Sequence, residues 1–168
     1  CSDKTGTLTE NRMTVTRAFA ASRTYEITGT GYAIEGEILL ADQPVPPRDQ
    51  PTLMQLLNCG FYCNNAHLSG RGGSGDPTEL ALRISGAKAD LVVDGVQRLV
   101  DIPFDSSSKY MAVLVDDGNR RLVLAKGAPE VIVQMCTTEI AATGEVRECD
   151  RDYALEIAQS FARDALRT

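Results

Sequence analysis

Two spacings of apolar residues divide the chain into predicted strands and helices. Alternation of apolar and polar positions predicts strands in five segments: residues 12–19, 23–28, 97–102, 111–115 and 121–125. Apolar residues three and four positions apart predict four helices, which begin at Asp49, Asp76, Gly127 and Asp150 and run through Asn64, Ile84, Cys136 and Ala165. Helices combined with hairpin-connected strands indicate the α+β fold class.

Turn and cap signals support this division. Asp116-Asp117-Gly118-Asn119 supplies hairpin-turn chemistry between two strands. Asp76-Pro77-Thr78-Glu79 combines an N-cap, a proline at the first helical position and a Glu three residues after the cap. Four prolines in residues 41–51 predict an exposed connector, because proline has no amide hydrogen for a sheet. The glycine-rich residues 69–75 predict a flexible loop.

Composition limits the classes of partner. The 168 residues carry 17 Lys and Arg against 23 Asp and Glu, and the formal net charge of −6 disfavours nucleic-acid binding. The longest apolar run, Tyr110 to Val115, is far shorter than the roughly 18 residues of a membrane span. The five cysteines are odd in number and form no C-x-x-C pair, so we expect a reduced, soluble domain rather than a disulfide framework.

Two glycine-rich patterns bind phosphates in many enzymes, and the chain matches only one of them. The P-loop pattern G-x-x-x-x-G-K-[ST] does not occur in the sequence. Residues 70–75 satisfy G-x-G-x-x-G, but the element predicted before them is a helix. Because this fingerprint works between a strand and a helix of a βαβ unit, a surface loop is favoured over a dinucleotide site.

The N-terminal run Cys1-Ser2-Asp3-Lys4-Thr5-Gly6-Thr7-Leu8-Thr9 carries the strongest chemical signal. A carboxylate that attacks a γ-phosphoryl group needs cations and hydrogen-bond donors around it, because it repels the incoming phosphate. Lys4 and the hydroxyls of Thr5 and Thr7 are suited to supply these around Asp3, with a bridging Mg²⁺. The run closely resembles the phosphorylation motif D-K-T-G-T-L-T of the P-type ATPases, cation pumps that form an aspartyl-phosphate.

Two central segments are similar to the nucleotide-binding domain of these pumps. Residues 75–82 resemble the segment whose glutamate, here Glu79, approaches the adenine. Residues 103–111 resemble the segment whose phenylalanine, here Phe104, stacks on the base while its lysine, here Lys109, lies beside it. Both segments occur in the order that the family has.

Two later segments extend the resemblance. Residues 126–130 are similar to the K-G-A-P-E motif at the floor of the pocket, which contributes Lys126 and Gly127. Leu166-Arg167 is similar to a late Leu-Arg pair whose arginine, here Arg167, reaches the nucleotide phosphates. Many members of the family carry Arg where this chain has Ser106, so one phosphate contact is missing or supplied elsewhere.

The resemblance implies a fold and a division of the chain. Residues 1–11 would form the edge of the phosphorylation domain with a hinge near residue 11, and residues 12–168 the nucleotide-binding domain. That domain would be a twisted antiparallel β-sheet flanked by helices. Because the chain has no initiator Met and starts at the motif, we expect it to be a piece of a longer protein.

The resemblance also implies a function. In the intact pump, ATP would phosphorylate Asp3 to drive cation transport, with Asp3 and Thr5 at the Mg²⁺ ion. The chain itself would be a monomeric cytoplasmic domain of a bacterial membrane protein that binds ATP without turnover. Its partners would be the rest of the phosphorylation domain and the actuator and transmembrane domains. Residues 29–37 are similar to type II pumps of the calcium class, but the transported ion stays open.

The residues themselves leave alternatives open. Stacking a base on an aromatic ring contributes about 1–3 kcal/mol, so an exposed Phe104 flanked by Lys109 and Lys126 would support weak adenine binding. Phe104 is otherwise a core aromatic residue at a strand end, and Glu79 a capping partner of Asp76. Two other functions remain: a soluble aspartyl-phosphate phosphatase or phosphotransferase, and an interaction module that binds no nucleotide.

Overall fold

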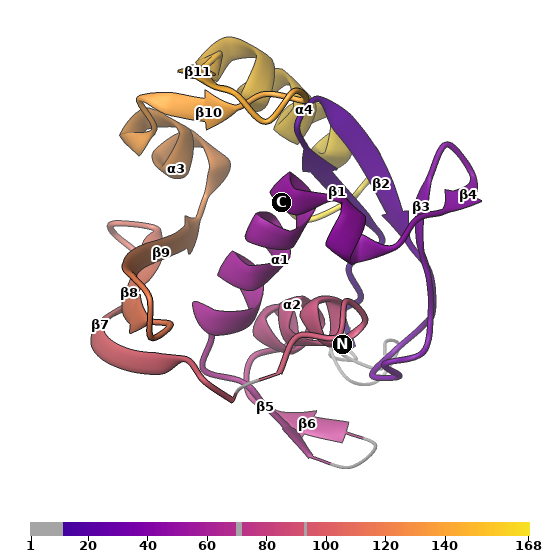
Figure 1. The fold of residues 1–168 in the computed structure, drawn as a ribbon, viewed down its shortest axis with the longest axis vertical. Coiled ribbons are helices and arrows are strands. Elements are labelled where there is room, and N and C mark those ends of the chain that lie inside the picture. Colours follow the sequence, from indigo (N-terminus) through magenta and orange to yellow (C-terminus); the bar gives the residue numbers. More distant parts are fainter. Residues whose placement is uncertain (1–11, 70–71, 93) are drawn as a thin grey trace, which may run out of the picture. The chain divides into compact units, whose positions relative to one another are not determined.

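The computed structural model describes residues 12–69, 72–92 and 94–168, which form two compact units (Figure 1). The first unit comprises the described residues up to 92, apart from 21–23, and the second comprises residues 21–23 and the described residues from 94 onward.

The first unit contains a four-stranded sheet in the order β1 (Arg17–Ala20), β2 (Arg23–Ile27), β3 (Ile38–Leu40) and β4 (Gln43–Pro44). The two predicted N-terminal strands are present, although the first begins at Arg17 rather than at residue 12. The prediction that residues 41–51 form only a connector is wrong, because they contain β4 and a 3-10 helix, η1 (Pro47–Asp49). Pro44 is tolerated because β4 is the edge strand and pairs only with β3.

Two helices of this unit, α1 (Pro51–Tyr62) and α2 (Pro77–Ala87), pack against each other (Figure 1). The predicted cap of α2 is confirmed, since the Asp76 carboxylate accepts hydrogen bonds from the amides of Thr78 and Glu79. The predicted Asp49 cap of α1 is wrong. Asp49 lies in η1, and α1 begins after Gln50 without a side-chain cap.

The core of the first unit lies between the four-stranded sheet and α1. Leu53 and Leu57 of α1 are buried in one cluster with residues of β1, β2 and β3 and with Ala89. The hydroxyl of the buried Tyr25 donates to the Gln50 side chain at 2.9 Å, just before α1 begins. Of the apolar stripe that the sequence predicts, Leu53, Leu57 and Phe61 form the buried face of α1, whereas Leu56 is exposed.

The prediction that residues 69–75 form a flexible loop is wrong for Ser69 and for residues 72–74, which lie in strands. β5 (His67–Ser69) and β6 (Gly72–Ser74) form an antiparallel pair that leads directly to α2. A Cβ atom at Gly73 would lie 2.4 Å from the Leu80 side chain, so glycine here permits close packing on α2 rather than flexibility. The antiparallel pairing also removes the strand context that a dinucleotide fingerprint requires.

The second unit begins with a three-stranded antiparallel sheet, β7 (Gln97–Asp105), β8 (Tyr110–Asp116) and β9 (Arg121–Gly127). The predicted hairpin turn between β8 and β9 is confirmed. The Asp117 carboxylate accepts hydrogen bonds from the amides of Asn119 and Arg120, each at 2.9 Å. Gly118 adopts the left-handed conformation, with φ of 84°.

The rest of the second unit is α3 (Pro129–Met135), the antiparallel pair β10 (Thr138–Ile140) and β11 (Val146–Glu148), and α4 (Arg151–Arg163). The two predicted C-terminal helices are confirmed, and Asp150 caps α4 through the Tyr153 amide at 3.0 Å. α3 packs against both β9 and α4.

The α+β fold class is confirmed. In the described residues the strands are distributed over four sheets, with antiparallel pairing in both units. None of the helices in the described ranges combines the length and the apolar character that a membrane span needs.

At the α1–α2 contact, substitution of two different glycines by alanine is expected to change stability in opposite directions. A Cβ atom at Gly86 would lie 2.6 Å from Cδ2 of the buried Phe61 and 2.9 Å from its Cβ, so we expect Gly86→Ala to destabilise the fold by about 1–3 kcal/mol. At Gly60 the nearest atom is Leu82 Cδ2 at 3.4 Å, an ordinary contact, so Gly60→Ala gains up to about 1 kcal/mol of helix propensity. Urea unfolding of both variants measures the difference. Equal stabilities would contradict the packing described for Phe61.

Candidate functional site

Two segments that the sequence singles out, residues 103–111 and 126–130, meet in the second unit. Gly127 pairs with Tyr110 across β8 and β9. The Ala128 amide donates to the Lys109 carbonyl oxygen at 2.9 Å. The Lys109 ammonium donates to the Glu130 carboxylate at 3.2 Å. The turn before β8 is therefore attached by backbone and side chain to the start of α3.

Gly127 makes this contact possible. A Cβ atom at this position would lie 2.3 Å from the Lys109 carbonyl oxygen and 2.7 Å from both Cα and Cβ of Tyr110. These neighbours are backbone or backbone-proximal atoms that cannot rotate away. No residue larger than glycine fits without moving the turn.

Asp105 organises the turn from β7 to β8. Its carboxylate accepts hydrogen bonds from the Ser107 hydroxyl, from the Ser107 amide at 2.9 Å and from the Ser108 amide at 3.2 Å. The Ser107 hydroxyl, followed by the two amides, lowers the pKa of Asp105 below its ordinary value. The Lys109 amide donates to the Asp105 carbonyl oxygen at 2.7 Å, and Lys109 adopts a left-handed φ of 57°. The turn thus has a defined geometry that presents Lys109.

Phe104 lies in a β-bulge. β7 pairs Ile102 with Ala112 and Asp105 with Tyr110, so Pro103 and Phe104 face a single residue of β8. The Phe104 side chain is 62% exposed. The core-aromatic interpretation is therefore excluded, and an apolar ring at this exposure is what a stacking surface requires.

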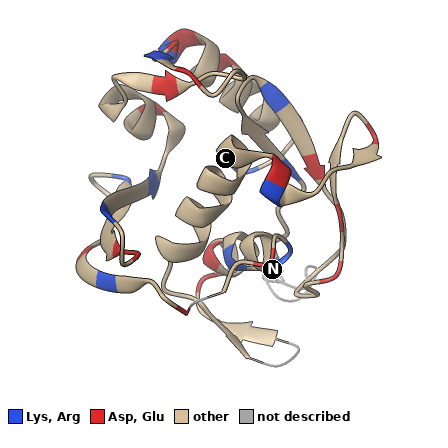
Figure 2. Cartoon of the chain, in the orientation of Figure 1, with Lys and Arg blue, Asp and Glu red and all other residues tan. Residues whose placement is uncertain are grey.

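The register places Phe104 level with Lys126. The residue of β8 that faces the bulge is Met111, and Met111 pairs on its other side with Lys126 of β9. Lys126 is half-buried. Charged residues of both signs lie along this sheet (Figure 2). Beside it, Lys109 in the turn before β8 and Glu130 in α3 form an ion pair, so their charges neutralise each other in part. The Glu130 amide, followed by Lys109, lowers the pKa of Glu130 below its ordinary value.

Glu79 lies in the first unit, in the first turn of α2. Its carboxylate accepts a hydrogen bond from the Asn65 amide at 3.3 Å. Its carbonyl oxygen accepts from the Asn64 side chain at 2.8 Å. The half-buried Glu79 is thus connected to the segment after α1 and not only to its own helix.

Asn64 is a residue that the sequence reasoning did not single out. It is 3% exposed, and its side-chain amide donates to the carbonyl oxygens of Gly60 and Glu79 while its oxygen accepts from the Ala66 amide at 2.8 Å. A buried polar group with every partner satisfied fixes the geometry around it. The available signal was a polar residue at helical spacing from the apolar positions of the predicted helix, although α1 ends at Tyr62.

The remaining predicted residues are not joined to this cluster. Arg167 is exposed in the segment that follows α4, just after Leu166, whose amide donates to the Phe161 carbonyl oxygen at 3.0 Å. Asp3 and Thr5 lie outside the described residues, as does the rest of the phosphorylation-motif resemblance. In the described part of the chain, no group of three or more His, Cys, Asp and Glu side chains is arranged to hold a metal ion.

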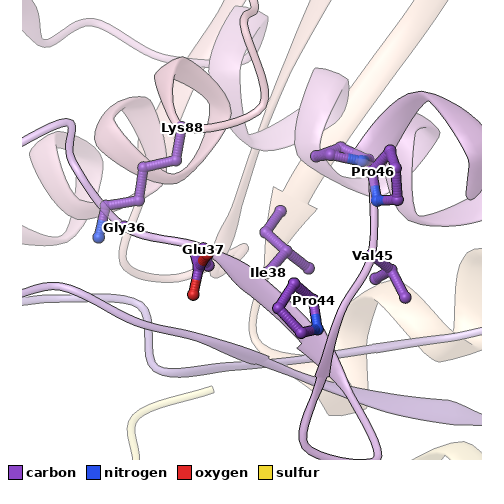
Figure 3. Close-up of a pocket in the computed structure, with 8 residues that line it drawn as sticks. Gly36, Glu37, Ile38, Pro44, Val45, Pro46 and Lys88 are labelled. Carbon is purple, nitrogen blue, oxygen red and sulfur yellow. The ribbon is translucent and has the colours of Figure 1, made fainter.

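A separate hollow of about 290 Å³ lies in the first unit, lined by residues 36–38 and 44–47 and by Lys88 (Figure 3). None of the residues that the sequence predicted for the site lines it. The Lys88 side chain extends from α2 toward Gly36 (Figure 3), and its ammonium donates to the Thr28 carbonyl oxygen at 2.5 Å. Burial lowers the pKa of Lys88, and the neighbouring Glu35 acts in the opposite direction.

Comparisons with known proteins identify similar sequences. The family model of the P-type ATPase cytoplasmic domain N matches residues 52–168. The chain is 38% identical over 186 residues to the cation-transporting ATPase pma1 of Synechocystis sp., which covers 99% of this chain and 20% of that protein. It is 38% identical over 180 residues to the calcium-transporting ATPase of Bacillus subtilis, covering 100% of this chain and 20% of that protein.

A human relative is more distant. The calcium-transporting ATPase type 2C member 1 of Homo sapiens is 37% identical over 147 residues, which covers 82% of this chain and 16% of that protein. The chain spans about a fifth of the length of the two bacterial relatives.

The contact at Gly127 predicts that Gly127→Ala destabilises the second unit by about 1–3 kcal/mol and displaces the turn that presents Lys109. Gly72→Ala is the matched control, since Gly72 also lies in a strand and a Cβ atom there would meet no atom within 4 Å. We expect that variant to stay within about 0.5 kcal/mol of the unchanged protein. Thermal unfolding provides the comparison, and an unaltered melting temperature for Gly127→Ala would show that the turn does not approach β9 this closely.

Proposed function

The chain belongs to the P-type cation-transporting ATPases, as their cytoplasmic nucleotide-binding domain N, and we propose that it binds ATP on the surface around Phe104. The observation that carries this assignment of the surface is the exposed Phe104 ring in a bulge of β7. Exposing an aromatic ring forgoes the burial that would otherwise stabilise the fold, and adenine stacking recovers that free energy on binding.

The two lysines supply the polar part of the interaction. Lys126 lies level with the bulge, and Lys109 lies at the end of the turn that follows Phe104. One N–H of the Lys109 ammonium donates to Glu130. An ammonium group has three donors, so Lys109 retains the capacity to donate to a nucleotide. Gly127 contributes by positioning Lys109 through its backbone contact.

Glu79 and Arg167 are included in the proposal on the resemblance to the family. Glu79 is assigned to the adenine and Arg167 to the phosphates. Their described surroundings are compatible with these roles, because Arg167 is exposed and the half-buried Glu79 carboxylate, which accepts from the Asn65 amide at 3.3 Å, is a group that can accept several hydrogen bonds.

For the intact protein we propose the activity of a cation pump. ATP held by this domain phosphorylates Asp3, with Asp3 and Thr5 at a Mg²⁺ ion that offsets the negative charge of the transferred group. The domain itself binds ATP without turnover, and it works with phosphorylation, actuator and transmembrane domains on the cytoplasmic side of a bacterial membrane. Relatives named calcium-transporting ATPases support the calcium class, whereas the relative from Synechocystis is named only for cations.

Isothermal titration of the chain with ATP tests the proposed surface. We expect a dissociation constant of about 1 mM, which corresponds to roughly 4 kcal/mol. Because stacking contributes about 1–3 kcal/mol, Phe104→Ala weakens binding at least about fivefold. Lys126→Ala weakens it as well, through the loss of a cation next to the triphosphate.

Two controls separate stacking from a general change of the surface. Phe104→Tyr keeps an aromatic ring and should retain binding, and Val123→Ala removes an equally exposed apolar side chain, 70% exposed on β9, without affecting ATP. An unchanged ATP affinity of Phe104→Ala would refute the stacking role. If titration of the unchanged chain with ATP produced no heat of binding, the chain would instead be an interaction module that binds no nucleotide.

A further inference from the structure

The segment of residues 12–16 belongs to the first unit and precedes β1, and groups from two directions contact it. The Thr14 hydroxyl accepts a hydrogen bond from the Gly31 amide at 3.2 Å. The Arg12 guanidinium carbon lies 5.3 Å from the centroid of the Tyr32 ring, within range of a cation–π interaction. On another side, the Thr78 hydroxyl donates to the Met13 sulfur at 3.4 Å.

The contacts made by Gly31 and Tyr32 come from the loop of residues 28–37, whose two ends are hydrogen-bonded to each other. The Thr28 amide donates to the Glu37 carbonyl oxygen at 2.9 Å, and the Glu37 amide donates to the Thr28 hydroxyl at 2.8 Å. Gly36 adopts a φ of 143°, and a Cβ atom there would lie 2.3 Å from the Thr28 carbonyl oxygen. The loop is therefore closed by geometry that other residues do not permit.

Helix α2 connects both sets of contacts. Thr78, in its first turn, contacts Met13, and Lys88, just after its last turn, donates to the Thr28 carbonyl oxygen at 2.5 Å. One rigid element thus holds the 12–16 segment directly at one end and through the 28–37 loop at the other. The backbone of Thr16 is fixed too, since its carbonyl oxygen accepts from the Ile27 amide at 2.9 Å.

We propose that Thr14, Tyr32 and Thr78 are positioning residues that fix the 12–16 segment to α2. In any hinge motion this segment therefore moves together with the first unit. The proposal has a functional consequence that rests on the proposed function. Glu79, the proposed adenine contact, follows Thr78 in α2, so a nucleotide that restrains this turn also restrains Met13 and its neighbours. Residues 12–16, which follow the candidate phosphorylation segment, then become more ordered when ATP binds.

Hydrogen exchange measured by mass spectrometry on the 168-residue chain tests the contacts in two steps. Without ATP, the Gly31 amide should exchange faster in Thr14→Val, which lacks the hydroxyl acceptor, than in Thr14→Ser, which keeps it. Equal exchange in these two variants would overturn the proposed fixation, whatever the result with ATP. Protected amides in α1 show that both variants are folded.

The second step adds ATP at a saturating concentration for each variant. In the unchanged chain we expect exchange in residues 12–16 to slow by about fivefold, a typical coupling factor. Tyr32→Ala and Thr14→Val should reduce this effect to less than about twofold, whereas Tyr32→Phe, which keeps the ring, should retain it. A residue with a merely structural role would change exchange equally with and without ATP.

The outcomes distinguish this inference from the proposed function. If titration shows that ATP binds but residues 12–16 exchange at an unchanged rate, the coupling is refuted and the proposed function stands. If the unchanged chain does not bind ATP, the proposed function fails, and the coupling fails with it. The comparison of Thr14→Val with Thr14→Ser still decides the fixation of the segment.

Discussion

A missing side chain at one position of β9 is the constraint on which the proposed nucleotide surface depends. At Gly127 the backbone comes so close to Lys109 and Tyr110 that a Cβ atom would lie 2.3 Å from a carbonyl oxygen. The hydrogen bond from Ala128 to Lys109 and the ion pair with Glu130 both follow from this approach. The surface that carries the exposed ring is thus organised by backbone contact and turn chemistry.

Structural and functional interpretations of a residue need not exclude each other, as Glu79 illustrates. Its helix start follows a capping pattern, which the structure confirms through Asp76. Its carboxylate nevertheless bonds to Asn65, and its carbonyl oxygen to the buried Asn64. These contacts cost little binding capacity, because a carboxylate accepts several hydrogen bonds. They also reduce the entropy that a flexible side chain loses when a ligand binds, which favours a role in recognition.

Sequence reasoning identified the elements whose signals are local. The cap at Asp76, the cap at Asp150 and the hairpin before Arg121 are each decided by a few neighbouring residues, and all three are confirmed. The strands β10 and β11, of three residues each, are too short to show a period and were not predicted. Residues 69–75 were wrongly read as flexible because composition alone does not distinguish a glycine that bends from one that packs, as Gly73 does on Leu80.

For the candidate site, the sequence predicts which residues take part but not how they are arranged. Phe104, Lys109 and Lys126 are identified by motifs, because the resemblance needs only the sequence. Their arrangement depends on the register of β7, β8 and β9, on the bulge and on the ion pair with Glu130, which join residues far apart in sequence. Asn64 was missed for the same reason, because one of its three partners, Glu79, becomes a neighbour only after α1 and α2 have packed.

The charges around Phe104 predict weak binding if the proposed nucleotide surface is correct, since the chain has a net charge of −6. Glu130 offsets part of the charge of Lys109, and the exposed Asp105 carboxyl, whose pKa is lowered by hydrogen bonds from Ser107 and Ser108, adds negative charge nearby. The electrostatic attraction for a triphosphate is therefore modest, and stacking of the base supplies much of the free energy. In the proposed pump, a domain that binds the base and holds the phosphates loosely would leave the γ-phosphoryl group available to the proposed Mg²⁺ ion and nucleophile.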